Sequence, residues 1–254
     1  MQRGYEQYHS EAMTRPPRHW VLIPAAGVGR RFGGVVPKQY LELGGRMVID
    51  HALALFVEHP AVAGCVVALG AEDGWWPSTE HAGHPRVLRA PGGAERCHSV
   101  ANGLARLAEG AEAADDDWVL VHDAARPCLH RDDLDRLIAA LADEPVGALL
   151  AVPMHDTVKR CGETPADRVE CTVPRHQLWR AFTPQAFRIG LLRRALAEAE
   201  IQGLAVTDDA SAVELLGLRP RLVEGRSDNI KITRQDDLPL ARFFLQQHAD
   251  APSC

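Results

Sequence analysis

Residues 21–32 read Val21-Leu22-Ile23-Pro24-Ala25-Ala26-Gly27-Val28-Gly29-Arg30-Arg31-Phe32. A short apolar run with β-branched residues, bounded by turn-forming residues, is typical of a buried parallel strand. The glycines that follow the run let the backbone approach a phosphate closely, with successive N–H groups directed at it. The stretch therefore predicts a strand that leads into a phosphate-binding loop.

Similar apolar runs recur along the chain and alternate with helical patterns. The predicted strands are residues 20–24, 64–69, 118–122 and 147–152. The predicted helices, in which apolar side chains recur every three or four residues, are 47–58, 95–108, 132–141 and 189–199. Strands that alternate with helices predict an α/β fold, here a single Rossmann-like three-layer domain with a mostly parallel twisted sheet.

Two segments interrupt this alternation. Residues 72–85 are polar and contain Trp75 and Trp76, which we interpret as tryptophans that pack in a loop. Residues 156–175 lack a helical period, so we expect a β-arm at about residues 154–177 that projects from the sheet. We place the domain at residues 20–247 and expect residues 1–19 to form a disordered or loosely ordered tail. This length leaves no room for a second domain of ordinary size, so we expect a single activity.

The acidic residues outnumber the basic ones, 34 to 28, and the net charge is −6. Binding to nucleic acid depends on many basic side chains that neutralise phosphates, so this balance argues against a general nucleic-acid-binding protein. No run approaches the roughly 20 apolar residues that cross a bilayer, and the six cysteines form no Cys-x-x-Cys pair. We therefore expect a cytoplasmic protein with reduced thiols and no membrane contact, in which a local cluster of cations holds any polyanionic substrate.

The loop after the first strand fits neither of two common nucleotide-binding motifs. The dinucleotide-binding fingerprint needs a third glycine where this chain has Phe32, and a P-loop needs a Gly-Lys-Ser/Thr sequence that is absent here. This argues against a dinucleotide-dependent oxidoreductase. Instead, Arg31 and Lys38 supply two cations suited to triphosphate oxygens that gain charge as a phosphoryl bond breaks. A glycine-rich turn with two surface cations is the alternative interpretation.

A second candidate loop, Pro91-Gly92-Gly93, precedes the second predicted helix. The N–H and C=O groups of such a turn can bind the edge of a base, and Ser99 lies one turn into the helix. The alternative is an ordinary helix start, with Glu95 near the positive end of the helix dipole.

Asp123 follows the predicted strand 118–122, so it stands at the carboxyl edge of the sheet, where open α/β sheets bind ligands. A carboxylate there can hold Mg²⁺ that bridges nucleotide phosphates, because Mg²⁺ needs only one or two protein oxygens. The alternative is a loop aspartate that pairs with Arg126 or with nearby N–H groups.

Taken together, these segments resemble a known enzyme family. The pattern Pro-Ala-Ala-Gly-x-Gly-x-Arg at 24–31, with Pro-Lys-Gln-Tyr at 37–40, is similar to the nucleotide loop of the 2-C-methyl-D-erythritol 4-phosphate cytidylyltransferase family. More distantly it resembles the sugar nucleotidyltransferases. Four further segments, 92–99, 121–127, 178–185 and 228–233, match the family in order. The resemblance extends from Trp20 to the C-terminal helix.

The resemblance implies a homodimeric enzyme that transfers the cytidylyl group of CTP to 2-C-methyl-D-erythritol 4-phosphate, with Mg²⁺ on Asp123, and whose arm reaches the neighbouring subunit's site. It implies that CTP is contacted by Pro24, Ala25, Ala26, Gly27, Gly29, Arg31, Lys38, Gly93, Ala94, Ser99, Asp123, Ala124 and Arg126. It implies that the polyol phosphate is contacted by Thr157, Arg175, Thr183, Thr207 and Lys231. The implied catalytic residues are Arg31, Lys38, Arg175 and Lys231.

Two positions depart from the family pattern. Ala94 stands where many members have Asp, so any contact made by that side chain is missing, and Asp209 replaces a longer acid. The segment around Asp209 also reads as a helix start with Thr207 as its N-cap, and Lys231 falls in a strand-like run. Two alternatives remain: a cytidylyltransferase for another polyol phosphate, such as ribitol 5-phosphate, and a non-catalytic nucleotide-binding module.

Overall fold

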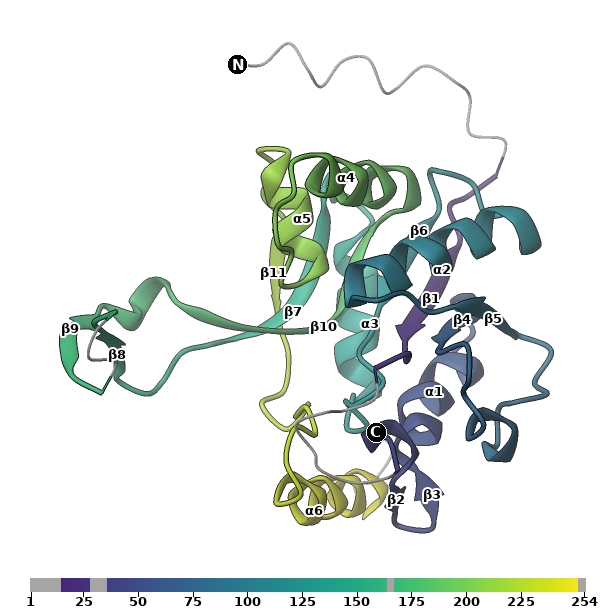
Figure 1. Ribbon diagram of the computed structural model, residues 1–254, viewed down its shortest axis with the longest axis horizontal. Coiled ribbons are helices and arrows are strands. Elements are labelled where there is room, and N and C mark those ends of the chain that lie inside the picture. Colours follow the sequence, from purple (N-terminus) through teal and green to yellow (C-terminus); the bar gives the residue numbers. More distant parts are fainter. Residues whose placement is uncertain (1–14, 28–35, 164–166, 251–254) are drawn as a thin grey trace.

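The computed structural model describes residues 15–27, 36–163 and 167–250. Within them, seven strands form the main sheet in the order β11-β7-β10-β6-β1-β4-β5 (Figure 1). These strands are β1 (His19–Pro24), β4 (Val62–Leu69), β5 (Val87–Pro91), β6 (Trp118–Val121), β7 (Gly147–Pro153), β10 (Trp179–Arg188) and β11 (Arg221–Glu224). Neighbouring strands are parallel, except that β10 is antiparallel to both β6 and β7. The predicted α/β fold with a mostly parallel sheet is confirmed.

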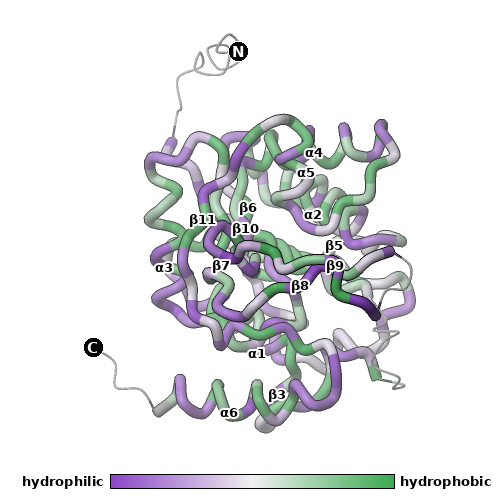
Figure 2. Tube along the Cα trace, turned by 90° about the vertical axis from the view of Figure 1, so that its left-hand side faces the viewer, coloured by the Kyte–Doolittle hydropathy of each residue, from purple (hydrophilic) through white to green (hydrophobic). Residues whose placement is uncertain are grey.

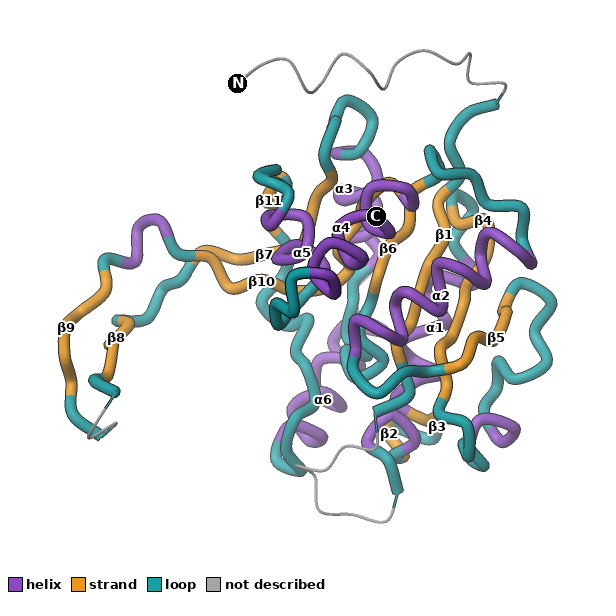
Figure 3. Tube along the Cα trace, turned by 45° about the horizontal axis from the view of Figure 1, so that its top comes forward, coloured by secondary structure: helices purple, strands orange, loops and turns teal. Residues whose placement is uncertain are grey.

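Helices cover both faces of this sheet and produce three layers (Figures 1 and 3). Helices α1 (Val48–Glu58) and α3 (Arg131–Ala140) pack on one face. On the other face lie α2 (Arg96–Gly110), α4 (Ile189–Ile201) and α5 (Asp209–Leu215). Each helix buries one apolar stripe against the sheet, which is the pattern that predicted α1 to α4 from the sequence.

Strand β1 shows how the sequence builds both layers. Side chains alternate between the faces of a strand, so Val21 and Ile23 pack against α1 and its neighbours, whereas Leu22 packs against α2. All three are fully buried, and the burial of each aliphatic side chain contributes roughly 2 kcal/mol. A strand buried on both faces has no polar side, which explains its continuous apolar sequence.

The C-terminal helix α6 (Asp237–Asp250) packs below the sheet on a small hairpin formed by β2 (Glu42–Leu43) and β3 (Arg46–Met47). Hydrophobic and hydrophilic residues alternate along α6 in Figure 2. Its buried side contributes Ala241 to a third apolar cluster, which also contains Leu43, Cys128 and Ile232. This cluster fixes the segment after β11 against the carboxyl edge of the sheet.

An arm projects from the body between β7 and β10 (Figure 1). Its outer part is the antiparallel pair β8 (Val158–Cys161) and β9 (Val169–Val173), followed by a 3₁₀ turn, η5 (Arg175–Gln177). Most residues of both strands are exposed to solvent. The predicted projecting arm is therefore confirmed.

Three strands of the sheet, β5, β10 and β11, were not among the predicted strands. β5 and β11 are edge strands with several exposed residues, so they lack the continuous apolar run of a central strand. β10 contains the polar sequence Thr183-Pro184-Gln185, and its pairing with β7 is interrupted between Ala181 and Gln185. The predicted strand-like run around Lys231 is wrong, because residues 229–233 form an irregular loop.

The predicted loop with two tryptophans is present after β4. Trp76 begins a 3₁₀ turn, η4 (Trp76–Ser78), and is buried in the core on the α1 face of the sheet, whereas Trp75 is exposed and stacks on Tyr40. Of the predicted N-terminal tail, residues 1–14 lie outside the described part of the chain. Among the described helices, none is both long and apolar enough to cross a membrane.

Candidate active site

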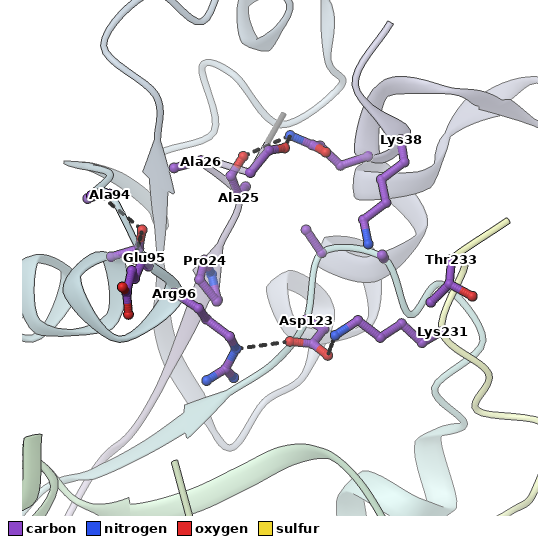
Figure 4. Close-up of a pocket in the computed structure, with 16 residues that line it drawn as sticks. Pro24, Ala25, Ala26, Lys38, Ala94, Glu95, Arg96, Asp123, Lys231 and Thr233 are labelled. Atoms are coloured by element: carbon purple, nitrogen blue, oxygen red, sulfur yellow. Dashed lines mark hydrogen bonds and ion pairs between the residues drawn. The ribbon is translucent and has the colours of Figure 1, made fainter. Parts of the chain in front are cut away.

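The loop after β1 begins at the carboxyl edge of the sheet and is shaped by a buried glutamine. Gln39 lies in the 3₁₀ turn η3 (Lys38–Tyr40), and its side-chain amide donates hydrogen bonds to the carbonyls of Ala25 (2.8 Å) and Gly27 (3.1 Å). These bonds tie η3 to the end of β1 and place Lys38 beside it (Figure 4). Gly29 and Arg31, both predicted CTP contacts, lie outside the described residues.

The turn at Gly92 and Gly93 closes a second side of the site. A Cβ atom on Gly92 would stand 2.1 Å from the Cβ of Ala26, and one on Gly93 would stand 2.2 Å from the Cβ of His98. Only glycine therefore lets this turn approach the β1 loop so closely. The N–H of Gly93 donates to the hydroxyl of Ser99 (3.0 Å), so these two predicted CTP contacts already hold each other.

Asp123 lies just after β6 and faces three cations. Its Oδ2 is 2.8 Å from Nζ of Lys231 and 3.5 Å from Nε of Arg126, and its Oδ1 is 3.2 Å from Nε of Arg96. Burial alone would raise the pKa of Asp123, but the charges of Arg96, Lys231 and Arg126 outweigh it and hold the pKa well below the usual range. Asp123 is therefore an anion at neutral pH, within a cluster of net positive charge.

A hydrogen-bond chain behind Asp123 fixes its backbone. The N–H of Asp123 donates to the hydroxyl of Thr183 (3.0 Å), and that hydroxyl lies 3.1 Å from Nδ1 of His122. Nε2 of His122 is 3.0 Å from the carbonyl of Arg126, which can only accept, so we assign the proton to Nε2. Complete burial lowers the pKa of His122 to about 4, so the ring is neutral and Nδ1 accepts from Thr183.

These loops enclose a cavity of about 580 Å³ at the carboxyl edge of the sheet. Figure 4 shows Lys38, Lys231 and Arg96 extending toward it from three different segments. The predicted residues that line it are Pro24, Ala25, Ala26, Gly27, Lys38, Gly93, Ala94, Ser99, Asp123, Ala124 and Lys231. Segments as far apart in the sequence as Pro24 and Lys231 thus converge on one cavity that combines backbone groups with cations.

Five other predicted residues do not line the cavity. Arg126 and Thr183 are buried behind it, where Arg126 donates to the carbonyl of Asn229 (2.7 Å). Thr207 is exposed and is not the N-cap of α5, because the side chain of Asp208 accepts from the N–H of Ser211 and so caps the helix. Thr157 and Arg175 are exposed on the arm, where Arg175 donates to the carbonyl of His155.

Arg96 and Gln39 were missed as site residues by the sequence reasoning, although both lie inside the matched segments. Arg96 is the first residue of α2, directly after the glycine turn, and this position was the available signal. Its second partner, Asp209, lies 113 residues further along the chain, with 2.8 Å between Nη2 of Arg96 and Oδ2 of Asp209. No sequence spacing indicates such a contact.

The acidic residues of the cavity can supply only a few of the oxygen ligands that Mg²⁺ needs. Among the described residues, no group of three or more His, Cys, Asp or Glu side chains is arranged to hold a metal ion. Asp123 and Glu95 are the acids of the cavity lining, and both oxygens of Asp123 face cations. Mg²⁺ usually takes one or two carboxylates together with waters and substrate phosphates, so Asp123 fits as a single ligand to a metal that arrives with a nucleotide.

Comparison with known proteins decides the family. Residues 19–247 match the family model described as IspD, 2-C-methyl-D-erythritol 4-phosphate cytidylyltransferase. The chain belongs to this family. It is 55% identical over 229 residues to 2-C-methyl-D-erythritol 4-phosphate cytidylyltransferase of Pseudomonas fluorescens (strain SBW25), with 90% of this chain and 96% of that protein covered.

Solved structures of the family share the fold. A crystal structure of 4-diphosphocytidyl-2C-methyl-D-erythritol synthase superposes with a TM-score of 0.79 at 40% identity, covering 91% of this chain and all of that one. The Francisella tularensis cytidylyltransferase gives a TM-score of 0.77 at 35% identity, covering 89% and 99% of the two chains. The bifunctional IspDF of Campylobacter jejuni matches over 54% of its length, with a TM-score of 0.70 and 25% identity.

Proposed function

We propose that the protein transfers the cytidylyl group of CTP to 2-C-methyl-D-erythritol 4-phosphate, in the non-mevalonate pathway to isoprenoid precursors. The products are 4-diphosphocytidyl-2-C-methyl-D-erythritol and pyrophosphate. The observation that carries this proposal is the cavity at the carboxyl edge of the sheet in a member of the cytidylyltransferase family. There Lys231 and Arg96 pair with Asp123, and Lys38 lines the same cavity.

The reaction is a direct displacement at phosphorus. A phosphate oxygen of the polyol attacks the α-phosphorus of CTP, the bond to the β-phosphate oxygen breaks, and pyrophosphate leaves with the electron pair. The attacking phosphate is already an anion at neutral pH, so the site needs no strong general base. It needs to position two anions and offset their repulsion. We assign this role to Lys38, Lys231 and Arg31, of which Arg31 lies outside the described residues.

Asp123 is the residue that would hold Mg²⁺. Bound there with CTP, the ion would neutralise charge that develops on the phosphates during displacement. Lys231 now pairs with Asp123 at 2.8 Å and is about one-third exposed, so its flexible side chain can turn to the attacking phosphate once a second cation neutralises the carboxylate. Arg96 is less mobile, because it is held by two acids.

We propose that the protein works as a homodimer whose arms complete the sites. Arg175 and Thr157 lie on the arm, which projects from the body of its own chain (Figure 1), and neither lines the cavity of that chain. A second copy related by a two-fold axis could receive these residues in its cavity, and the exposed faces of β8 and β9 would then be covered. We also infer a cytoplasmic location, because the described cysteines are all unpaired, as in a reducing compartment.

A pyrophosphate-release assay with CTP and Mg²⁺ tests the activity. We expect release with 2-C-methyl-D-erythritol 4-phosphate, and little with ribitol 5-phosphate or when ATP, GTP or UTP replaces CTP. Release with ribitol 5-phosphate alone would keep the chemistry and reject the substrate. Silence with every pair would favour a nucleotide-binding module.

Mixing two inactive variants tests the shared site. Lys38→Ala removes a cavity cation and should lower kcat about 10³-fold, as loss of a cation on transition-state charge does in other phosphoryl transfers. Arg175→Ala should weaken use of the polyol phosphate in the partner's cavity. A mixed dimer contains one cavity with Lys38 beside the partner's intact arm, so refolding the variants together should restore activity toward a quarter to a half of the parent value. No recovery in a verified mixed dimer would mean that each chain uses its own arm.

A further inference from the structure

A buried acid that the mechanism above does not use lies behind the cavity. Asp209 is 1% exposed, and its Oδ2 accepts from Nη2 of Arg96 at 2.8 Å. Its Oδ1 is buried and has no hydrogen-bond partner among the described residues. Burial raises the pKa of the Asp209 carboxyl, while Arg96 acts to lower it, so the fold gains little from an acid here. A role in the site explains its presence better than a role in stability.

Arg96 joins this acid to Asp123. Its planar guanidinium uses Nη2 for Asp209 and Nε for Asp123, which lies 3.2 Å away. The guanidinium is rigid and planar. When Asp209 holds Nη2, the direction from which Nε approaches Asp123 is therefore also fixed. Asp209 is thus connected to the reacting region through one intermediate side chain.

Asp209 is itself held rigidly at the first position of α5. The side chain of Gln185 in β10 bonds to both neighbours of Asp209. The amide nitrogen of Gln185 donates to the carboxylate of Asp208 (2.8 Å), and the amide oxygen accepts from the N–H of Ala210 (2.8 Å). The same strand supplies the Thr183 hydroxyl that accepts from the N–H of Asp123 (3.0 Å). One strand therefore sets the positions of both acids that Arg96 connects.

Charge also favours this arrangement. With Arg96, Arg126 and Lys231 around Asp123, a nucleotide triphosphate would attract every cation of the cluster. The second acid holds Arg96 away from the phosphates, so that it stays on Asp123 while Lys231 is released. We propose that Asp209 is a positioning residue for cytidylyl transfer, which acts by anchoring Arg96 so that Asp123 keeps one orientation during turnover. This inference rests on the proposed function of the cavity.

The test separates positioning from general damage by measuring kcat and CTP affinity separately. Asp209→Asn removes the anchor charge and leaves Arg96 free to reach a phosphate. We expect kcat with CTP and 2-C-methyl-D-erythritol 4-phosphate to fall about 10- to 100-fold, as for other residues that orient a metal ligand. The dissociation constant of CTP, measured by calorimetry, should stay within twofold or decrease, because the cavity gains net positive charge. A damaged fold would instead raise that constant while kcat falls.

Two companion variants control for the local structure. Asp209→Glu keeps the carboxylate and should retain kcat within a few-fold of the parent. Ser211→Ala removes the hydroxyl that accepts from the N–H of Asp208 at the start of α5 and leaves every charge in place, so its kcat should match the parent. An equal loss in Ser211→Ala and Asp209→Asn would overturn the proposal, because disturbance of the helix start would then explain both.

A double-variant cycle tests the connection through Arg96. Lysine has a single ammonium and cannot contact two acids in a fixed fork, so Arg96→Lys should show the same drop in kcat. Asp209→Asn combined with Arg96→Lys should lose no more than Arg96→Lys alone; losses that multiply would overturn the proposal. Arg96→Lys also carries the test if Asp209→Asn does not fold. A parent enzyme inactive with every polyol phosphate would reject the proposed function, whereas normal kcat in Asp209→Asn beside an active parent rejects only this inference.

Discussion

Asp117 and Asp123 stand at opposite ends of strand β6, and each has a pKa held well below the usual range against the effect of burial. Asp117 accepts from the backbone N–H groups of Arg18 and Ala114, from the indole of Trp20 and from two arginine side chains. Its side chain is 1% exposed, against 11% for Asp123. None of these donors lines the cavity of the candidate site, so we interpret Asp117 as a structural acid.

Asp123 is bound differently. Of the three cations that its carboxylate faces, Arg96 and Lys231 line a cavity together with Lys38. Several cations around a single acid leave uncompensated positive charge in the cavity, and this charge can bind a polyanion. The comparison teaches that a depressed pKa alone does not distinguish a structural acid from a functional one. The distinction depends on whether the groups that contact the carboxylate also line a cavity.

The largest expected effect is on turnover and concerns Asp123, at the end of β6 that borders the cavity. Asp123→Asn removes the proposed metal ligand and should lower kcat about 10²- to 10³-fold, which is about 3 to 4 kcal/mol of barrier. The free energy of unfolding should change less, because Arg96 and Lys231 can then face solvent. Steady-state kinetics and urea unfolding of the same preparation give both numbers. A variant that unfolds readily but turns over normally would place Asp123 among the structural acids.

The next largest effect is on stability and concerns Asp117, at the other end of β6. Asp117→Asn leaves several donors facing an amide and should lower the free energy of unfolding by about 3 kcal/mol at neutral pH, with kcat near the parent value. Because the folded pKa of Asp117 is depressed, its contribution is complete above the unfolded pKa of about 3.9 and is lost as the pH falls through the folded pKa. The gap between variant and parent should therefore narrow below about pH 4 in urea unfolding. Asp116→Asn, at the exposed neighbouring acid, is the matched control and should show no such gap.

The smallest effect concerns one peripheral partner of Asp117. The Arg18 guanidinium is about one-third exposed, and its Nε lies 3.4 Å from the carboxylate. Arg18→Ala keeps the backbone N–H of residue 18 and the Trp20 indole as donors to Asp117. It should therefore lower the free energy of unfolding by less than about 1 kcal/mol. Urea midpoints at a constant m-value would measure it, beside Arg193→Ala as an exposed ion-pair control. A loss as large as that of Asp117→Asn would mean that side-chain charge, and not the backbone donors, holds this end together.

The sequence predicts the strands that have continuous apolar runs well, and it predicts the edge strands and the interior strand β10 poorly. Strand β1 is buried on both faces, so its apolar run is unambiguous, and Asp123 follows an equally clear strand. β10 carries Thr183 and Gln185 toward buried polar partners, and this gives no strand pattern. Polar residues that a distant segment satisfies cannot be recognised from local spacing.

The candidate site divides along the same line. Lys38, Gly93 and Asp123 were found because each belongs to a short local motif. Thr207 was expected to cap α5, but Asp208 does so, since either residue type can cap a helix and only the backbone geometry decides. The link from Asp209 to Arg96 spans 113 residues and is visible only after folding. The roles of Arg175 and Thr157 on the arm depend on a second chain and stay predictions.

A crystal structure with CTP and Mg²⁺ tests the contrast between the two ends of β6 most directly. We expect the triphosphate in the cavity beside Lys38, a metal ion on Asp123, Lys231 turned away from that carboxylate, Arg96 still bound to Asp209, and every contact of Asp117 unchanged. A nucleotide bound elsewhere, or one that leaves the Asp123–Lys231 pair intact with no metal on Asp123, would contradict the account.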